Sequence, residues 1–150
     1  KVYEFQKEGF IKINDIKIKY FEVDHKPVPY AYGFSFFNKN KKLTISGDTR
    51  PCESLMLNAQ NAEVLLHEVF IEYEINQTSG LRSNKTLHNV KEYHTPSNLV
   101  GKVAKLSNCK KLVLTHFVPS RFNISKLKNV VKKDFGKDPI IGNDLLTINI

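Results

Sequence analysis

The fold is decided by the stretch Leu43-Thr44-Ile45-Ser46-Gly47-Asp48-Thr49-Arg50-Pro51, in which a short apolar run leads into a glycine turn and then a proline. The apolar run predicts a strand, Gly47 predicts a tight turn, and Pro51 suits the first turn of a helix. In open α/β folds, ligands gather where loops leave the carboxyl ends of strands, so Asp48 is placed to face a metal or substrate. An Asp beside a glycine is more commonly a solvated turn residue, so other residues must decide between the two interpretations.

Composition describes one ordinary globular domain covering residues 1–150, with 41% hydrophobic and 25% charged residues. No apolar run approaches the roughly 20 residues needed to span a bilayer, and the chain start lacks the shape of a signal peptide. We therefore expect a soluble, cytoplasmic protein with no membrane partner. Cys52 and Cys109 lack the spacing of a zinc or redox motif, which predicts free, buried thiols.

The charge of the chain favours an anionic partner. Lys and Arg number 23 against 15 for Asp and Glu, which gives a formal net charge of +8. Such an excess attracts polyanions, including RNA. A polyanion-binding module without catalysis is therefore an alternative to any enzymatic hypothesis.

The first third of the chain predicts a meander of strands. Pro27 and Pro29 cannot donate to a strand ladder, so the chain leaves the sheet there and His25 lies on a loop at a strand end. The pair of strands before the glycine turn forms a hairpin that delivers Asp48. The expected strands are residues 2–5, 11–13, 16–21, 30–37 and 42–46.

The remainder predicts alternating helices and strands, which is the order of an α/β layered domain. Helices are expected at residues 52–59, from Thr95 as N-cap to Leu106, and at 123–135. Buried strands are expected at 64–66, ending before His67, and at 111–115, ending before His116; a closing hairpin is expected from 140–141 and 145–150. The polar stretch 71–93 predicts a long active-site loop.

Histidine and carboxylate residues recur at the expected strand ends and at one helix mouth. They are His25, Asp48, His67, Glu68, His94 and His116. Imidazole and carboxylate are the ligands that Zn²⁺ takes when it keeps an open position for water, and such an ion supplies hydroxide for hydrolysis. Each residue also has an ordinary alternative: His25 as a solvated loop residue, His67 and Glu68 as the first wet positions after a strand, and His94 as part of a cap. His88 is expected to be a surface residue.

Several motifs together resemble the carboxyl-terminal half of metallo-β-lactamase-fold hydrolases, closest to ribonuclease Z and the arylsulfatase-like branch. They occur in the same order over nearly the whole chain: Val23-Asp24-His25, Ser46-Gly47-Asp48-Thr49-Arg50, Leu66-His67-Glu68-Val69-Phe70, His94-Thr95, Leu114-Thr115-His116-Phe117 and Ile141-Gly142-Asn143-Asp144-Leu145. The resemblance implies a four-layer αββα fold, of which these residues are mainly the carboxyl-terminal β/α half.

The resemblance also implies roles for individual residues. By analogy, His25 would ligate one Zn²⁺, Asp48 would bridge two ions, and His116 would ligate the other, with Mn²⁺ or Fe as alternatives. Glu68 and His94 would be a catalytic proton-relay pair, in which the carboxylate orients the imidazole that protonates the leaving oxygen. His67 would be a buried support, and Arg50 and Arg121 would contact an anionic substrate.

Two departures from the family pattern shape the expectations about partners and substrate. The family's other metal ligands come from a His-x-His-x-Asp-His motif in its amino-terminal half, and these 150 residues contain no such run. We therefore expect a homo-oligomer, or pairing with the missing amino-terminal half. Ribonuclease Z also carries a tRNA-gripping arm between the segments matching Gly33 and Ser46, where only a short turn fits. The substrate stays open between RNA, another phosphodiester, a sulfate ester and a lactone.

Overall fold

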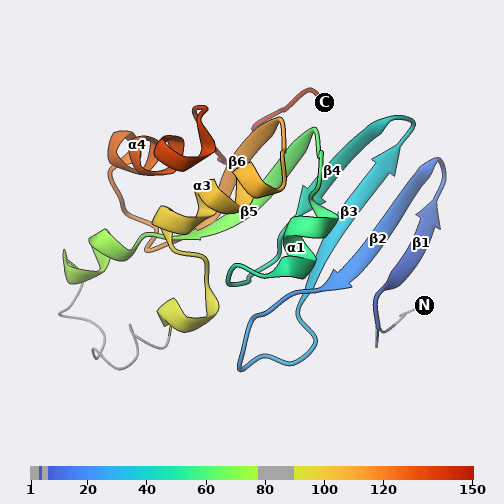
Figure 1. Ribbon diagram of the computed structural model, residues 1–150, viewed down its shortest axis with the longest axis horizontal. Coiled ribbons are helices and arrows are strands. Elements are labelled where there is room, and N and C mark those ends of the chain that lie inside the picture. The colour runs from blue at the N-terminus through green and yellow to red at the C-terminus, as the bar shows by residue number, and fades with distance from the viewer. Residues whose placement is uncertain (1–3, 5–6, 78–89) are drawn as a thin grey trace.

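The protein forms one mixed sheet with helices against one of its faces (Figure 1). The structure, a computed structural model, describes residue 4, residues 7–77 and residues 90–150. The seven strands follow one another in chain order across the sheet. They are β1 (Gly9–Ile13), β2 (Ile16–Glu22), β3 (Tyr32–Asn38), β4 (Lys41–Ile45), β5 (Val64–Phe70), β6 (Lys111–Val118) and β7 (Ile140–Ile141). The helices are α1 (Glu53–Asn58), the 3₁₀ helix η1 (Glu72–Gln77), α3 (Ser97–Leu106) and α4 (Ile124–Phe135).

The first four strands are antiparallel because tight turns join them. Asn14 and Lys39 take positive φ angles of 52° and 51° in the β1–β2 and β3–β4 turns. Asn tolerates that conformation better than most residues, which suits it to a short hairpin. From β4 onward the strands run parallel, because a helix or loop returns the chain between them.

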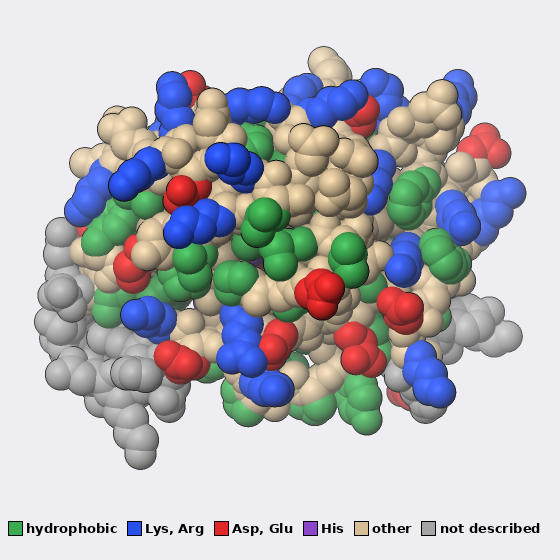
Figure 2. All heavy atoms as spheres, viewed as in Figure 1, with side chains coloured by type: hydrophobic (Ala, Val, Ile, Leu, Met, Phe, Trp, Pro, Cys, Tyr) green, Lys and Arg blue, Asp and Glu red, His purple; other side chains and the backbone are tan. Residues whose placement is uncertain are grey.

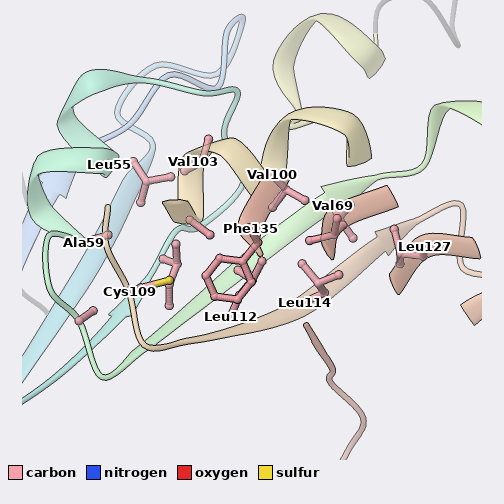
Figure 3. Close-up of a cluster of buried hydrophobic side chains, with 14 of the residues drawn as sticks. Leu55, Ala59, Val69, Val100, Val103, Cys109, Leu112, Leu114, Leu127 and Phe135 are labelled. Atoms are coloured by element: carbon pink, nitrogen blue, oxygen red, sulfur yellow. The ribbon is translucent and has the colours of Figure 1, made fainter. Parts of the chain in front are cut away.

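The hydrophobic core lies between the sheet and α1, α3 and α4. Leu65 and Val69 of β5 and Leu112 and Leu114 of β6 point into it, each 0% exposed. Figure 3 shows these strands meeting side chains of the helices, among them Val100, Val103, Leu127 and Phe135. Asn123 caps α4 through a hydrogen bond to the N–H of Lys126, and Gly136 ends the helix at φ 80°.

None of the helices in the described residues lies against the opposite face of the sheet, and we call it the open face. Strand register places apolar residues on this face from one strand to the next. One such row consists of Ile11, Ile18, Phe36, Leu43 and Val64. A hollow of about 510 Å³ lies over β4, β5 and β6 on this side, lined by Leu66 and Val113 among others and reaching His116.

The structure corrects several expected boundaries. β5 continues through His67 and Glu68 to Phe70, and β6 continues through His116 to Val118, so these polar residues lie inside strands. The two expected strands are too short because polar side chains interrupt the apolar runs. The helix expected from Thr95 has Pro96 as its N-cap.

The two segments expected at 71–93 and at the end of the chain also differ. Ile71 is fully buried and η1 follows it, so the segment is not one continuous loop. Residues 78–89, with His88, lie outside the described residues, as does most of the strand expected at 2–5. The closing hairpin is wrong: β7 pairs with β6 in parallel, and residues 145–150 form no strand.

None of the helices in the described part of the chain has the length and apolar character that crossing a bilayer requires.

Candidate metal centre

Asp48 is delivered by a turn that accepts only glycine at its first position. Gly47 has φ +63°, and a Cβ atom there would lie 2.5 Å from the carbonyl oxygen of Tyr32. The Ser46 N–H donates to Leu66 O, which ties the end of β4 to β5. The Asp48 side chain is 40% exposed, so its carboxylate is open to solvent or a ligand.

Glu68 is held at the centre of the site. Its side chain is 1% exposed, and its Oε1 accepts hydrogen bonds from the N–H of Thr49 (3.2 Å) and of Thr95 (2.8 Å). The hydroxyl of Thr95 donates to Thr49 O at 2.7 Å, which joins the two loops that hold the carboxylate. The sequence did not predict that Thr49 and Thr95 hold Glu68, although each directly follows a predicted site residue, Asp48 or His94.

His94 lies against Glu68. Its Nδ1 is 3.2 Å from Glu68 Oε1, and the side chain is 7% exposed. Apart from this approach to Glu68 Oε1, the buried His94 Nδ1 makes no hydrogen bond within the described part of the chain, and the buried Glu68 Oε2 has no hydrogen-bond partner there. Because buried polar atoms normally have partners, these two atoms are suited to bind a proton or a ligand.

His25 presents one defined nitrogen to the site. Its Nδ1 lies 2.8 Å from Tyr93 O, and because a carbonyl oxygen only accepts, Nδ1 carries the proton. Nε2 is therefore left with its lone pair, as in metal-ligating histidines whose other nitrogen donates to a carbonyl. The imidazole ring packs edge-on against His94, with ring centroids 5.0 Å apart.

His116 reaches the site through an irregularity in β6. Thr115 pairs with Glu68 and Phe117 pairs with Val69, so His116 is an extra residue at a bulge, and its φ is 45°. Bulges re-aim side chains near functional sites. Here the bulge brings Nδ1 of His116 within 3.4 Å of Asp48 Oδ1, and its ring stacks on His94 at 5.5 Å.

The five predicted site residues therefore converge from five separate segments. His25, Asp48 and His94 have ligand atoms within 4.8 Å of one another, and so do Glu68, His94 and His116. Imidazole nitrogens and carboxylate oxygens are the donors that Zn²⁺, Mn²⁺ or Fe accept in hydrolases. The donor set and the orphaned buried atoms together fit a metal centre.

Two other predicted residues lie elsewhere. His67 points into the hydrophobic core, where burial lowers its pKa and its Nδ1 donates to Glu68 O at 2.7 Å. It is therefore not a wet position after a strand, but a buried neighbour of Glu68. Arg50 is tied to Asp24, with Nε donating to Oδ2 at 2.8 Å, so it fastens the His25 loop to the Asp48 turn.

Several curated proteins are similar in sequence. The chain is 26% identical over 137 residues to a putative ribonuclease Z of Mycobacterium tuberculosis (strain CDC 1551 / Oshkosh), an alignment covering 90% of this chain and 59% of the relative. A ribonuclease Z of Latilactobacillus sakei is 38% identical over 78 residues, or 52% of this chain and 22% of the relative. The chain spans about half the length of such Mycobacterium tuberculosis relatives. No protein-family model matches it.

Solved structures agree on the fold. The metallo-beta-lactamase fold protein YhfI from Bacillus subtilis superposes with a TM-score of 0.70 at 19% identity, over 92% of this chain and 51% of that one. The short form of human tRNase Z superposes with a TM-score of 0.59 at 23% identity, over 93% of this chain and 45% of that one. Zn(2+)-bound PqqB from Methylobacterium extorquens superposes with a TM-score of 0.65 at 13% identity, over 97% of this chain and 51% of that one. The chain has the metallo-β-lactamase fold, and the resemblance to ribonuclease Z drawn from the sequence is confirmed.

Proposed function

We propose that this chain is the carboxyl-terminal part of a metal-dependent hydrolase of the ribonuclease Z type, which cleaves a phosphodiester bond. The observation that supports it best is the convergence of His25, Asp48, Glu68, His94 and His116 on one edge of the sheet. The sequence similarity to ribonuclease Z supports the choice of substrate class.

In this proposal the chain's own residues hold the metal and orient the proton donor. His25 Nε2, the Asp48 carboxylate and His116 would hold the metal, with Asp48 shared between two ions. A bound pair of Zn²⁺ ions supplies a hydroxide nucleophile at neutral pH. Glu68, fixed by two backbone N–H groups, keeps His94 in place to donate a proton to the leaving oxygen.

Metal analysis of the full protein tests the proposal first. We expect tightly bound zinc, which Asp48→Asn reduces strongly because a bridging carboxylate is lost. Asp15→Asn is the matched control, since Asp15 is exposed in the β1–β2 turn at the far end of the sheet. Absence of any divalent ion from the wild type at neutral pH would leave the non-catalytic, polyanion-binding alternative.

A second candidate is a hydrolase of small esters, such as a sulfate ester or lactone. The tight β3–β4 turn favours it, because it leaves no room for an arm that grips tRNA. Assays with a precursor tRNA, bis(p-nitrophenyl) phosphate and an aryl sulfate separate the two. Turnover of the sulfate alone would replace the first candidate by the second.

We infer that the open face packs against a second half of the fold, carried by the same polypeptide or by another chain. The matched solved structures have about twice the matched length, and the hollow on the open face reaches His116. An apolar sheet face normally packs on another layer. A homo-oligomer is the other way to cover this face. We expect the protein to act in the cytoplasm, where Cys52 and Cys109 would stay reduced.

A further inference from the structure

A group of basic side chains lies on the helix-covered side of the sheet, at the end away from the candidate metal centre. Strand register places its members directly opposite one another on β1 to β4, so they share one face. We call this group the lysine ladder: Lys12, Lys17, Lys19 and Lys42, with the rings of Phe10 and Phe37 between them. Lys19 and Phe21 are two residues apart on β2, so their side chains lie on the same side of the sheet. Phe21 belongs to the helix-covered core, so the lysine ladder lies on the helix-covered side.

The described helices leave the outer part of the lysine ladder, on β1 and the start of β2, uncovered. Lys12 and Lys17 are exposed, and Phe10 is 54% exposed. The Lys42 ammonium donates to Gln60 O at 2.8 Å, just beyond the end of α1, so α1 reaches only the inner edge of the ladder. Figure 2 shows basic side chains beside hydrophobic ones at the right, over β1 and β2. The ladder also faces away from the open face and stays accessible when that face is packed.

The positive charges of the ladder are poorly neutralised. Lys12 and Lys17 are directly opposite each other, an arrangement of like charges that destabilises a strand pair. Among the described residues, the one carboxylate in an ion pair with the ladder is Glu8, 3.7 Å from Lys19 and itself 63% exposed. An exposed pair of this kind contributes little. Burial and the charge of Lys19 both lower the pKa of Lys42.

The aromatic rings give the surface a second property. Lys17 Nζ lies 4.0 Å from the centroid of the Phe10 ring, and Lys42 Nζ lies 5.7 Å from that of Phe37. Lysines that follow a phosphate backbone, together with aromatic faces on which bases stack, are the two features of surfaces that bind single-stranded nucleic acid. A membrane-binding surface would instead separate its charged and apolar faces.

We propose that the lysine ladder binds the phosphate backbone of single-stranded RNA, with Phe10 stacking on a base. Only the choice of RNA over DNA rests on the proposed function; the binding of phosphate and base does not. β2 leads from the ladder toward the metal centre, and the eight residue steps from Lys17 to His25 span on the order of 25 Å. An RNA strand bound at the lysine ladder would therefore extend toward the candidate metal centre.

Fluorescence anisotropy of the full protein with a short labelled single-stranded RNA tests the proposal, with EDTA present to prevent cleavage. The triple variant Lys12→Gln, Lys17→Gln, Lys19→Gln should bind about 30- to 100-fold more weakly at about 0.1 M salt. The slope of log affinity against log salt should become shallower by about 2, because each phosphate contact on a single strand contributes roughly 0.7. Lys42 is left unchanged because its tether to Gln60 supports α1.

The matched control removes the same charge elsewhere. Lys102, Lys105 and Lys133 are exposed on α3 and α4, and their replacement by Gln should change the affinity less than threefold. Phe10→Leu should weaken binding about fivefold or more, whereas Phe10→Tyr keeps the ring and should bind like the wild type. Equal losses in the two triple variants would show that net charge alone binds RNA, and would overturn the proposal. Binding to phosphatidylserine vesicles without binding to RNA would overturn it as well.

RNA binding by the lysine ladder and the proposed hydrolytic function can be disproved independently of each other. The ladder variant should hydrolyse bis(p-nitrophenyl) phosphate at the wild-type rate, and Asp48→Asn should lose hydrolysis while binding RNA normally. RNA binding that depends on the ladder, in a protein without hydrolytic activity, refutes only the enzyme. If the protein hydrolyses the substrate and the ladder variant binds RNA as tightly as the wild type, only the proposed RNA binding by the lysine ladder is refuted.

Discussion

At the scale of single residues, His94 has two chemically distinct uses. It belongs to both groups of candidate ligands, and it also lies against the buried carboxylate of Glu68. A histidine oriented by a fixed carboxylate is suited to proton donation, whereas a ligand needs its lone pair directed at the metal. Mutation distinguishes these uses.

We expect His94→Ala to lower turnover by roughly a hundredfold or more while zinc stays bound, as for loss of a general acid. His25→Ala is the contrasting variant and should lose metal, because Nε2 of His25 is the nitrogen left free to ligate. Turnover and zinc content of both proteins would be measured together. Loss of zinc from His94→Ala would make His94 a ligand instead.

Cys109 predicts a pH dependence of stability. Burial raises the pKa of its thiol from 9.0 to about 11. The folded protein therefore keeps the proton at pH values where the unfolded chain loses it, and the free energy of unfolding should fall as pH rises above 9. The slope from this residue is up to about 1.4 kcal/mol per pH unit.

Urea unfolding between pH 8 and 10 measures this slope. Cys109→Ala should flatten it, although the variant is less stable at every pH because it leaves a cavity. Tyr73, whose pKa is raised to about 12 by burial, adds to the fall mainly above pH 10. An unchanged slope in Cys109→Ala would mean that the thiol stays neutral in both states or ionises in both.

At the scale of elements, the turn after β4 connects sequence to site. Gly47 combines a left-handed φ with close contact to Tyr32, so a side chain there is excluded twice. This part of the site could be predicted from the sequence, because a glycine between an apolar run and an Asp is typical of a tight turn at a strand end. The bulge that aims His116 could not be predicted from the sequence. An apolar run followed by His looks the same whether the strand ends there or continues through a bulge.

Gly47→Ala should cost about 3 kcal/mol or more, because the Tyr32 carbonyl must move and the left-handed φ is itself unfavourable. Gly136→Ala is the control: its φ is +80°, but no atom lies within 4 Å of the added Cβ. That change should cost only about 1 to 2 kcal/mol. Thermal unfolding of both variants, with zinc content, measures the difference. Equal losses would show that the contact with Tyr32 contributes nothing.

The same scale shows why the strand ends could not be predicted. His67, Glu68 and His116 are expected after strand ends, since charged groups rarely continue a buried strand. Glu68 continues it because two backbone N–H groups donate to one of its carboxylate oxygens, Oε1, and these groups come from loops distant in sequence. Such long-range partners cannot be read from local sequence pattern, whereas a helix with its own caps, such as α4, is predicted to within one residue.

At the scale of the whole molecule, the two faces of the sheet differ in chemical character. One face carries the helices and the lysine ladder, and the other carries apolar rows across neighbouring strands. Leu43 lies in the hollow on the open face. Leu43→Glu should therefore disrupt packing of a second layer while leaving the helix-covered core intact.

Sedimentation and zinc content of the full protein would measure that effect. We expect loss of compactness or of the partner, together with weaker zinc binding, in Leu43→Glu. Lys41→Glu, at an exposed position two residues earlier, is the control and should behave like the wild type. Normal zinc and hydrodynamic behaviour in Leu43→Glu would place the second layer elsewhere.

The apolar open face has a calorimetric consequence. Removing apolar surface from water lowers the heat capacity, so association of the two layers should become more exothermic as temperature rises. Below room temperature the driving force weakens, and an assembly held mainly by this face would loosen in the cold. Metal bound between the layers would then be released on cooling, a behaviour that a site built on one rigid layer would not show.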